Sequence, residues 1–374
     1  MNSFQNYINK ELISIKEKNR YRVLKLPNGI DLSSNDYLCM SKHPKVLEAL
    51  KEGIDLYGAG SGASRLIRGH RDIFEKTETQ FANWVQSETS LFVANGFAAN
   101  LGLLDAISDP KTIIFTDRLN HASILDGIRI SGAVKKYYHH KDMTHLRELL
   151  KKANPSSPKI IVSETLFSMD GDITPIVELI NLKKEFDACL ILDEAHALGV
   201  FGKNGAGLAL ENEGANTLLA DIDFRIYTGG KSLGLEGAFI ACSNLSKEYL
   251  INTMRTFIFS TSPLPAILYA LGITIDLVIE MEEERKRILE NSNILKSGLR
   301  EFGFETLNSE SQIVPVVLFE EQTALKRALH LQEKGFDIRA IRPPTVKESR
   351  LRISINSGIT KSVIFDLLDK LKHE

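Results

Sequence analysis

A lysine and an aspartate in two separate motifs are the residues of this chain best suited to chemistry. Lys231 lies in the small-residue loop Tyr227-Thr228-Gly229-Gly230-Lys231-Ser232, and Asp193 ends the apolar run Leu190-Ile191-Leu192. A lysine amine can form a Schiff base with an aldehyde, and a buried carboxylate can hold a positive charge on a ring nitrogen. Together they indicate a pyridoxal phosphate (PLP) site, in which Lys231 carries the cofactor and Asp193 keeps its pyridine ring protonated.

Each motif taken alone has other interpretations. Gly230-Lys231-Ser232 suggests a phosphate-binding P-loop, but Arg225 stands where that pattern requires its first glycine. The apolar run ending at Asp193 also resembles a strand that binds a nucleotide-associated magnesium ion, an interpretation that needs such a P-loop. Lys231 as a solvated loop lysine is the remaining alternative, and the glycines around it argue for close backbone approach instead.

Polar side chains recur directly after the strands that the sequence predicts. His121, Ser168 with Asp170, Asp193 with His196, and Lys231 each follow an apolar run. Near-continuous apolar runs separated by helical stretches predict a mainly parallel, doubly wound α/β sheet, and ligands bind beyond the carboxyl ends of its strands. The predicted strands are 90–93, 112–116, 160–164, 190–193, 225–228 and 238–242. If these residues have only structural roles, Asp193 would cap a helix. His121 and His196 would then be loop or core residues whose ring nitrogens are hydrogen-bonded within the protein.

A phosphate group needs backbone N–H groups at the start of a helix. The segment Asn95-Gly96-Phe97-Ala98-Ala99-Asn100 follows the first predicted strand and opens a helix, with Gly96 allowing close approach. Thr228 adds a hydroxyl near Lys231. A plain strand-to-helix turn is the alternative for this segment. The glycine-rich loop 58–65 fits a flexible loop on the substrate side better than a dinucleotide site.

Composition excludes several classes of protein. The chain has 374 residues, 43% of them hydrophobic, and a formal net charge of -2, so nothing electrostatic favours nucleic acid. The three cysteines, Cys39, Cys189 and Cys242, are far apart and indicate neither disulfides nor a metal site but a reducing cytoplasm. No run is long and apolar enough for a membrane span, and residues 1–22 lack a signal core.

The rest of the pattern predicts a second, smaller unit. We expect an N-terminal segment (1–45) packed with it, a large α/β domain (46–270) and a small C-terminal α+β domain (271–374). The predicted elements outside the large sheet are a helix over 1–22, a hairpin over 23–32, a long helix over 266–301 with a solvated polar middle at 280–287, strands at 314–319, 338–341 and 351–355, and helices at 323–334 and from 360.

The chain resembles the α-oxoamine synthases, PLP enzymes of the aspartate aminotransferase fold type. The matching stretches run in order along almost the whole chain: Ser33-Ser34-Asn35-Asp36-Tyr37-Leu38, Gly60-Ser61-Gly62-Ala63-Ser64-Arg65, Asp117-Arg118-Leu119-Asn120-His121-Ala122-Ser123, Phe167-Ser168-Met169-Asp170-Gly171-Asp172, Asp193-Glu194-Ala195-His196 and Thr228-Gly229-Gly230-Lys231. Within the family, Ile341-Arg342-Pro343-Pro344-Thr345-Val346 and Ser349-Arg350-Leu351-Arg352-Ile353 resemble the members that condense L-alanine with a pimeloyl thioester in biotin biosynthesis.

The resemblance implies a role for each site residue. Lys231 is the cofactor lysine, Asp193 the partner of the ring nitrogen, and His121 the residue stacked on the ring. The other implied contacts are Ser168 and His196 to the phenolic oxygen, Gly96, Phe97 and Thr228 to the phosphate, Thr261 and Ser262 to the phosphate of the other subunit of a homodimer, Arg352 and Asn35 to the amino-acid carboxylate, Thr345 near the substrate, and Arg20 to the acyl substrate.

The implied reaction yields 8-amino-7-oxononanoate, carbon dioxide and a free thiol, with pimeloyl-CoA or pimeloyl-acyl carrier protein as the thioester. Other members of the family pair glycine with acetyl-CoA, or serine with a long-chain acyl thioester. A protein that keeps the fold but has lost catalysis is a third hypothesis, whose expected mark is loss of the lysine. Lys231, Asp193 and His121 are all present.

Overall fold

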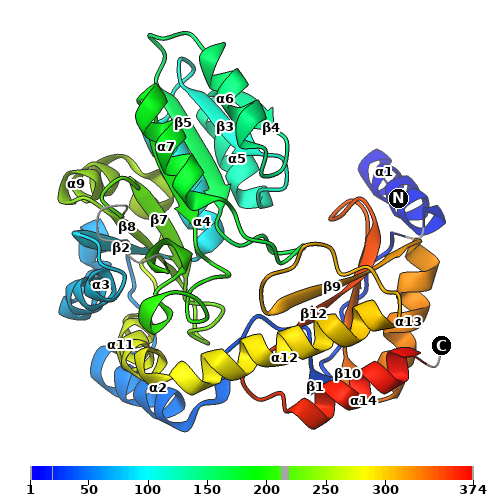
Figure 1. Ribbon diagram of the computed structural model, residues 1–374. Helices are drawn as coiled ribbons and strands as arrows, with labels where there is room; N and C mark the ends of the chain where they lie inside the picture. Colours follow the sequence, from blue (N-terminus) through cyan, green and yellow to red (C-terminus); the bar gives the residue numbers. More distant parts are fainter. Residues whose placement is uncertain (1, 19, 212–218, 373–374) are drawn as a thin grey trace.

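A computed structural model describes residues 2–18, 20–211 and 219–372 of the chain. Two groups of elements are visible in Figure 1, one around a large sheet and one around a small sheet, with the long helix α12 running beneath the small sheet. The elements up to the end of the large sheet are α1 (Ser3–Glu17), β1 (Ile30–Asp31), α2 (Pro44–Tyr57), α3 (Asp72–Trp84), β2 (Thr89–Val93), α4 (Gly96–Ile107), β3 (Ile113–Asp117), α5 (Ala122–Ser131), β4 (Val134–Tyr138), α6 (Met143–Lys151), β5 (Lys159–Glu164), α7 (Ile176–Phe186), β6 (Cys189–Asp193), β7 (Phe224–Thr228) and β8 (Ala238–Cys242).

The large sheet has the strand order β2-β8-β7-β6-β5-β3-β4. Neighbouring strands from β7 to β4 are parallel, whereas β8 runs antiparallel to both β2 and β7. The predicted mainly parallel α/β sheet is therefore confirmed. All six predicted strands lie in it, and the seventh, β4, was missed because it is an edge strand with mostly exposed residues and no apolar run.

Helices cover both faces of this sheet, as a doubly wound fold requires. Alternate strand residues point to opposite faces. Leu91, Val93 and Ile240 pack with α4, α5 and the following helices α9 (Asn244–Thr253) and α10 (Arg255–Ile258), whereas Phe92 and Phe239 pack with helices of the opposite face. Both faces of the strands are thus buried, which explains their continuous apolar runs.

The C-terminal elements are α11 (Pro265–Glu280), α12 (Glu282–Glu301), β9 (Ile313–Phe319), α13 (Glu321–Glu333), β10 (Phe336–Asp337), β11 (Arg339–Ile341), β12 (Ser349–Ser354) and α14 (Lys361–Lys372). Three of these strands form an antiparallel sheet of order β11-β12-β9. The N-terminal segment joins them through β1, which pairs in parallel with β10. The domain boundaries at 45 and 270 stay a prediction.

The predicted hairpin over residues 23–32 is wrong. Only Ile30 and Asp31 form a strand, and their partner is β10, far along the chain. Leu24 and Leu26 are almost fully exposed, so alternation there does not mark a buried face. A side chain at Gly29 would meet the Gly335 carbonyl oxygen at 2.3 Å, which shows how closely the two segments approach. Local pattern could not reveal a partner so distant in sequence.

The single helix predicted over 266–301 is two helices, separated at Met281. Arg285 is buried and donates to the carbonyl oxygens of Val278 (2.6 Å) and Ile279 (3.2 Å) at the end of α11. Three glutamates then open α12, where a helix start favours negative charge. The stretch 280–287, which we expected to be a solvated face, is therefore the junction between the two helices. There Arg285, from α12, caps the C-terminal end of α11.

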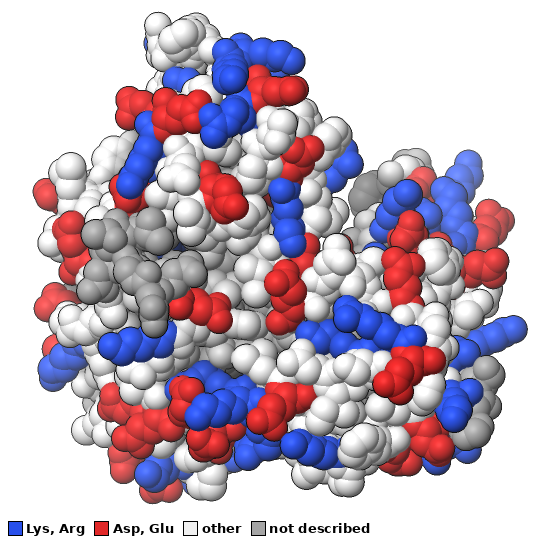
Figure 2. All heavy atoms as spheres, viewed as in Figure 1, with Lys and Arg blue, Asp and Glu red and all other residues white. Residues whose placement is uncertain are grey.

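The surface facing the viewer carries both signs of charge in an interspersed pattern (Figure 2). None of the described helices is both long and apolar enough to traverse a lipid bilayer. The N-terminal helix α1 ends at Glu17, earlier than predicted, and none of its residues is buried within the described chain. It lies apart from the large sheet, above α13 (Figure 1).

Candidate functional site

A cavity of about 310 Å³ lies where the ends of the parallel strands meet the small sheet. Its wall combines residues from the N-terminal segment, from the loops after β3, β5, β6 and β7, and from the strands β11 and β12. The lining residues are Ser33, Asn35, His121, Ser168, Met169, His196, Lys231, Arg339, Ile341 and Arg352. Six of the fourteen residues predicted for the site are among them: Asn35, His121, Ser168, His196, Lys231 and Arg352.

Lys231 follows β7 in a loop that only glycines allow. A side chain at Gly229 would lie 2.4 Å from the Glu236 carbonyl oxygen, and Gly234 has a φ of +64°, with the Ser41 nitrogen only 2.2 Å from a side chain placed there. The protein surrounding the Lys231 amine removes water from it. That desolvation, only partly offset by the charges of Asp193 and Glu164, lowers the pKa of Lys231 to about 8. Much more of the amine is therefore neutral and nucleophilic near neutral pH than in an ordinary lysine.

Asp193 ends β6 and is buried. Its carboxylate accepts hydrogen bonds from the Ala195 backbone N–H (2.9 Å) and from Asn100 Nδ2 on α4 (2.7 Å). No described cation forms an ion pair with it, so a protonated ring nitrogen would be its natural partner. The sequence placed Asn100 only in the phosphate segment. No spacing in the sequence pointed to this second role, because Asn100 and Asp193 are 93 positions apart and meet only in the folded chain.

His121 caps the N-terminus of α5, and its ring is exposed toward the cavity. Ring nitrogen Nδ1 lies 2.8 Å from Ser123 Oγ, which fixes the ring orientation. The His121 backbone N–H donates to Glu164 Oε1 at 2.7 Å. Burial and the charge of Asp193 raise the pKa of Glu164 to about 8, and desolvation together with the charge of Lys231 lowers the pKa of His121. Glu164, the last residue of β5, was not predicted from the sequence.

His196 is buried beneath the cavity, with Nδ1 2.7 Å from the hydroxyl of Tyr37. Desolvation and the charges of Lys231 and Arg352 hold the pKa of His196 well below its usual range, so the ring is neutral. Tyr37 belongs to the 33–38 motif but had no assigned role. Its hydroxyl also lies 3.5 Å from Arg352 and links the two halves of the site.

The start of α4 and Thr228 together form a cradle for an anion. A side chain at Gly96 would first meet Thr228 Oγ1 at 3.8 Å, so the helix start opens toward that hydroxyl. Asn95 caps the helix by accepting from the Ala98 N–H at 2.8 Å. Phe97 projects beside His121, with ring centroids 6.5 Å apart. A helix start leaves its first N–H groups without helical partners, which suits a phosphate.

Arg352 on β12 is buried at the opposite wall of the cavity. Its guanidinium donates to the Ser168 carbonyl oxygen (2.6 Å) and to Asn35 Oδ1 (3.0 Å). Within the described part of the chain no carboxylate pairs with it. A buried guanidinium held only by neutral acceptors is suited to a carboxylate ligand.

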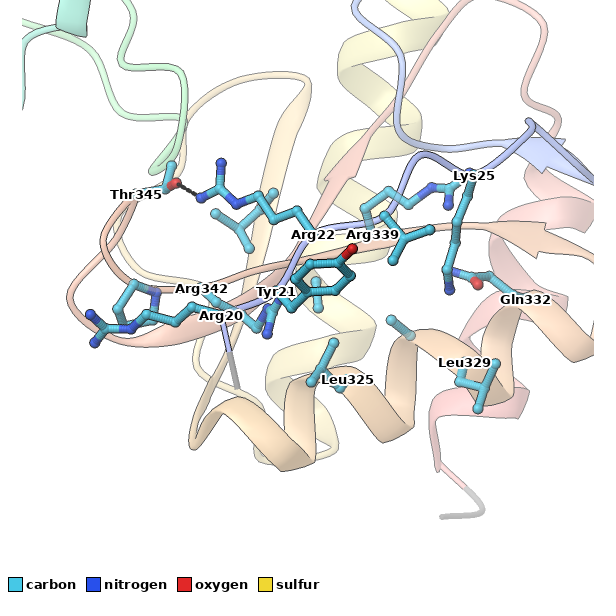
Figure 3. Close-up of a pocket in the computed structure, with 15 residues that line it drawn as sticks. Arg20, Tyr21, Arg22, Lys25, Leu325, Leu329, Gln332, Arg339, Arg342 and Thr345 are labelled. Atoms are coloured by element: carbon cyan, nitrogen blue, oxygen red, sulfur yellow. Dashed lines mark hydrogen bonds between the residues drawn. The ribbon is translucent and has the colours of Figure 1, made fainter. Parts of the chain in front are cut away.

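Asp193, Gly96, Phe97 and Thr228 are not among the residues that line this cavity, and four further predicted residues line other pockets. Arg20 and Thr345 line a separate pocket next to this cavity, where Arg22, not Arg20, donates to Thr345 Oγ1 at 3.3 Å (Figure 3). Thr261 and Ser262 line a small hollow beside Arg65. The resemblance implies that these last two serve the other subunit, and neither is among the residues that line the Lys231 cavity.

His140 links the loops that carry His121 and Ser168. Its Nδ1 lies 3.0 Å from Asp117 Oδ1 at the end of β3, and its Nε2 lies 2.8 Å from Asp172 Oδ2 in the loop after β5. Burial opposes a charge there, but the hydrogen bonds and charges of Asp117 and Asp172 raise the pKa of His140 to about 9. Lys141 also pairs with Asp172 at 2.9 Å. The imidazolium thus bridges two carboxylates.

Among the described residues, His140, Asp170 and Asp172 are the group whose ligand atoms lie close enough to hold a metal ion. Positive charge is already supplied there by the protonated ring, by Lys141 and by Arg350, which pairs with Asp170. The group therefore works as an ion-pair network between loops rather than as a vacant cation site.

We expect the stability of the protein to depend on pH through His140. Because its folded pKa lies above the ordinary value of about 6.5, its contribution is complete below pH ~6.5 and is lost as pH rises through about 9. Allowing for solvent at this partly open site, the loss is on the order of 2 kcal/mol. Urea unfolding of the wild type and of His140→Gln between pH 6 and 10 measures it.

The difference in unfolding free energy between the two proteins should shrink as pH rises. Taking that difference cancels other groups that titrate in the same range, including Lys231. Asp117, Asp172 and Lys141 face His140 in both proteins. A difference that is constant across the whole range would mean that the His140 bridge is not protonated.

The donor set of the cavity fits PLP. The desolvated amine suits an aldehyde, and the buried carboxylate without a cationic partner in the described chain suits a protonated ring nitrogen. The imidazole face open to the cavity suits the face of a ring, and the helix start beside a hydroxyl suits a phosphate. Lys231, Asp193, His121 and the pair Gly96 and Thr228 supply these groups. All are positioned by the ends of strands in one sheet.

Comparisons with known proteins agree with this geometry. Residues 27–371 match the model of the family described as aminotransferase class I and II. A protein of Bacillus cereus (strain ATCC 10987 / NRS 248) named "Putative 8-amino-7-oxononanoate synthase" is 39% identical over 373 residues, covering 96% of this chain and 94% of its own. A Bacillus anthracis protein of the same name is 40% identical and covers 92% of this chain and 87% of its own.

Solved structures share the whole architecture. Serine palmitoyltransferase from S. paucimobilis, with a bound PLP–myriocin aldimine, superposes with a TM-score of 0.90 at 26% identity and covers 100% of this chain and 98% of its own. The 8-amino-7-oxononanoate synthase of Francisella tularensis has a TM-score of 0.79 at 29% identity, with 92% and 97% coverage. This chain is a PLP-dependent enzyme that belongs to the aminotransferase class I and II family, in its α-oxoamine synthase branch.

Proposed function

We propose that the protein condenses L-alanine with a pimeloyl thioester, releasing carbon dioxide and a free thiol and giving 8-amino-7-oxononanoate for biotin biosynthesis. The observation that carries a condensation on an amino acid is Arg352, a buried guanidinium without a carboxylate partner in the described chain that faces Lys231 across one cavity. The choice of this pair of substrates is supported by relatives that bear the name of that synthase at 39–40% identity.

Each cofactor contact is assigned to a residue in or beside the cavity. Lys231 would hold the aldehyde carbon, Asp193 the ring nitrogen and His121 the ring face. Gly96, Phe97 and Thr228 would bind the phosphate, and Ser168 and His196 would lie at the phenolic oxygen. PLP supplies an electron sink for the electrons left when a bond at the amino-acid α-carbon breaks.

The chain itself would bind the amino acid and move its proton. Arg352, steadied by Asn35, would fix the carboxylate and so set which bond at the α-carbon is presented for cleavage. The Lys231 amine, with its pKa lowered to about 8, would accept the α-proton and later return one to the product. His196 is neutral and can donate one hydrogen bond without adding charge.

The remaining assignments concern the acyl substrate and a second subunit. Arg20 and Thr345 would contact the acyl substrate from the pocket beside the cavity, together with Arg22. Thr261 and Ser262 would contact the phosphate bound by the other subunit of a homodimer acting in the cytoplasm. Sedimentation of the purified enzyme tests the dimer.

Thiol release from a crossed panel tests the proposed reaction. L-alanine, glycine and L-serine are each offered pimeloyl, acetyl and palmitoyl thioesters. Release confined to L-alanine with the pimeloyl thioester is expected, because the related synthases bear that name. Release with another pair would overturn the choice of substrates and leave PLP chemistry in place.

Condensation of L-serine with a palmitoyl thioester is the second candidate. It is favoured by the fold comparison, since serine palmitoyltransferases superpose with TM-scores of 0.90 at 26% identity. Sequence identity to the proteins named for the other reaction is higher, at 39–40%. Strong release with L-serine and the palmitoyl thioester in the same panel would reverse this order.

A further inference from the structure

A chain of hydrogen bonds runs from the ring of His121 to the carboxylate of Asp193 through two buried side chains, Ser123 and Asn100. Ring nitrogen Nδ1 of His121 lies 2.8 Å from Ser123 Oγ, and Asn100 Nδ2 lies 3.1 Å from the same oxygen. Asn100 Nδ2 also lies 2.7 Å from Asp193 Oδ2. Because Ser123 and Asn100 are both buried, solvent does not compete for these contacts. Neither residue has a role of its own in the proposed reaction.

The chain crosses from one helix to another because α4 and α5 approach closely. A side chain at Gly127 on α5 would lie 3.0 Å from the Asn100 carbonyl oxygen on α4, which shows how tightly the two helices pack. Asn100 Oδ1 is buried there without a hydrogen-bond partner in the described chain, which is costly for a polar atom. The two hydrogen bonds donated by Nδ2 are therefore what an asparagine contributes at this position.

The chemistry of the partners sets the direction of each hydrogen bond. An amide nitrogen only donates and a carboxylate only accepts, so the two hydrogens of Asn100 Nδ2 go to Asp193 and to Ser123 Oγ. The Ser123 hydroxyl, which accepts from Asn100, then donates its own hydrogen to His121 Nδ1. The Ser123 backbone N–H also donates to this ring nitrogen, at 3.2 Å. With two donors directed at it, Nδ1 is an acceptor, and the ring hydrogen lies on Nε2.

A positive charge on the His121 ring would break this pattern. An imidazolium carries a hydrogen on each ring nitrogen, so its Nδ1 hydrogen would face the Ser123 backbone N–H. Desolvation lowers the pKa of His121, and the charge of Lys231 acts in the same direction against that of Asp193. At the other end of the chain, the Asn100 N–H needs an acceptor, which an ionised Asp193 provides. The hydrogen bonds thus favour a neutral ring at one end and a charged carboxylate at the other.

We propose that Asn100 and Ser123 are positioning residues that keep His121 neutral, with its hydrogen on Nε2, while Asp193 stays charged. The proposal rests on the proposed function, in which His121 covers the face of the PLP ring and Asp193 holds the ring nitrogen. An imidazolium stacked on a ring with a protonated nitrogen would place two like charges in contact, which favours the loss of one proton. A neutral imidazole removes that conflict, so the ring nitrogen keeps the proton on which the electron sink depends.

Removing the Ser123 hydroxyl should raise the pKa of His121, because Nδ1 loses a donor that only the neutral ring can use. The titratable groups that face the ring in both proteins are Asp193, Lys231, Glu164 and His196. Below its raised pKa, Ser123→Ala carries an imidazolium, whereas above that pKa its ring is neutral as in the wild type. The ratio of variant to wild-type kcat, for thiol release with L-alanine and pimeloyl-CoA, should fall about tenfold at about one pH unit below that pKa and stay within about twofold near pH 9.

Nuclear magnetic resonance of the ring nitrogens tests the proposal directly on the PLP-loaded enzyme. The nine histidine rings are labelled with nitrogen-15, and the His121 signals are those missing from the spectrum of His121→Gln. In the wild type, the chemical shifts should show a hydrogen on Nε2 and none on Nδ1 between about pH 6 and 9. Ser123→Ala should move the midpoint of the His121 titration to higher pH. Ser156→Ala, which changes an exposed serine in the loop before β5, is the control and should leave it unchanged.

Asn100→Leu tests the second link, because Asn100 acts on His121 only through its neighbour. Leucine keeps the size of the side chain but frees Ser123 Oγ to accept from a hydrogen on Nδ1. The midpoint of the His121 titration should therefore move in the same direction as in Ser123→Ala. The double variant should move it no further than Ser123→Ala alone, since both changes act through one hydroxyl. Shifts that add would overturn the role of Asn100.

The other outcomes decide between this proposal and the proposed function. A hydrogen on Nδ1 in the wild type, or a His121 titration that Ser123→Ala leaves unchanged, would overturn the proposal. A kcat lowered equally at every pH would also overturn it, since that marks a structural defect rather than a change of charge. If the resonance results hold while no pimeloyl thioester turns over, the proposed substrates fail and the roles of Asn100 and Ser123 stand. Turnover of L-alanine with pimeloyl-CoA by an enzyme with a hydrogen on His121 Nδ1 would leave only the proposed function in place.

Discussion

Replacing Lys231 with alanine is expected to lower turnover by about a thousandfold or more, measured as thiol release with L-alanine and pimeloyl-CoA. The Lys231 amine is the cavity group proposed both to hold the cofactor and to move the α-proton. Alanine removes both functions. The fold should survive, because the glycines of the loop set its backbone path and the lost side chain faces the cavity.

Two further measurements make the Lys231 result specific. Borohydride treatment of the wild type, followed by peptide mapping, should place the pyridoxyl group on Lys231 and nowhere else. Lys203→Ala, which changes an exposed lysine in the loop region after β6, should keep full activity and the yellow colour of the bound cofactor. Full turnover by Lys231→Ala would overturn the assignment of this cavity as the active site.

Site residues at strand ends could be predicted because one physical rule places them. Parallel strands put their carboxyl ends at the same edge of the sheet, so polar residues that follow apolar runs must come together. His121, Ser168, His196 and Lys231 all line one cavity for this reason. The strands were recognisable because both of their faces are buried, which leaves long apolar runs.

Residues that act through a neighbour could not be predicted in the same way. Asn100 holds Asp193 from the middle of α4, and Tyr37 holds His196 from the N-terminal segment. Each contact joins segments far apart in sequence and has no spacing that would reveal it. The same reason explains the pairing of Ile30 with Phe336. The local spacing of apolar residues indicates which positions are buried and whether the period is that of a helix or a strand. The contacts named here depend instead on where segments distant in sequence meet.

Asp193→Asn is expected to lower kcat by about a hundredfold to a thousandfold while the protein still binds PLP. The change keeps the size of the side chain but removes the charge that would hold the protonated ring nitrogen. Without that proton the ring accepts electrons less well. The measurement is kcat for thiol release from pimeloyl-CoA with L-alanine, alongside the absorbance of the bound cofactor. Asp126→Asn, which changes a partly exposed carboxylate on α5 paired with Arg129, serves as the control and should behave as wild type.

The surroundings of Asp193 make this substitution a test of charge rather than of folding. Its two donors, the Ala195 N–H and Asn100 Nδ2, can both be accommodated, because Asn100 Oδ1 is buried without a hydrogen-bond partner in the described chain and can accept from the new amide if the Asn100 side chain rotates. Losing the carboxylate should also lower the pKa of Lys231 further, since the charge of Asp193 raises it. The pH profile of the residual activity should therefore shift to lower pH. An unchanged kcat with an unchanged profile would mean that Asp193 neither faces the ring nitrogen nor interacts with Lys231, and the role assigned to its negative charge would have to be abandoned.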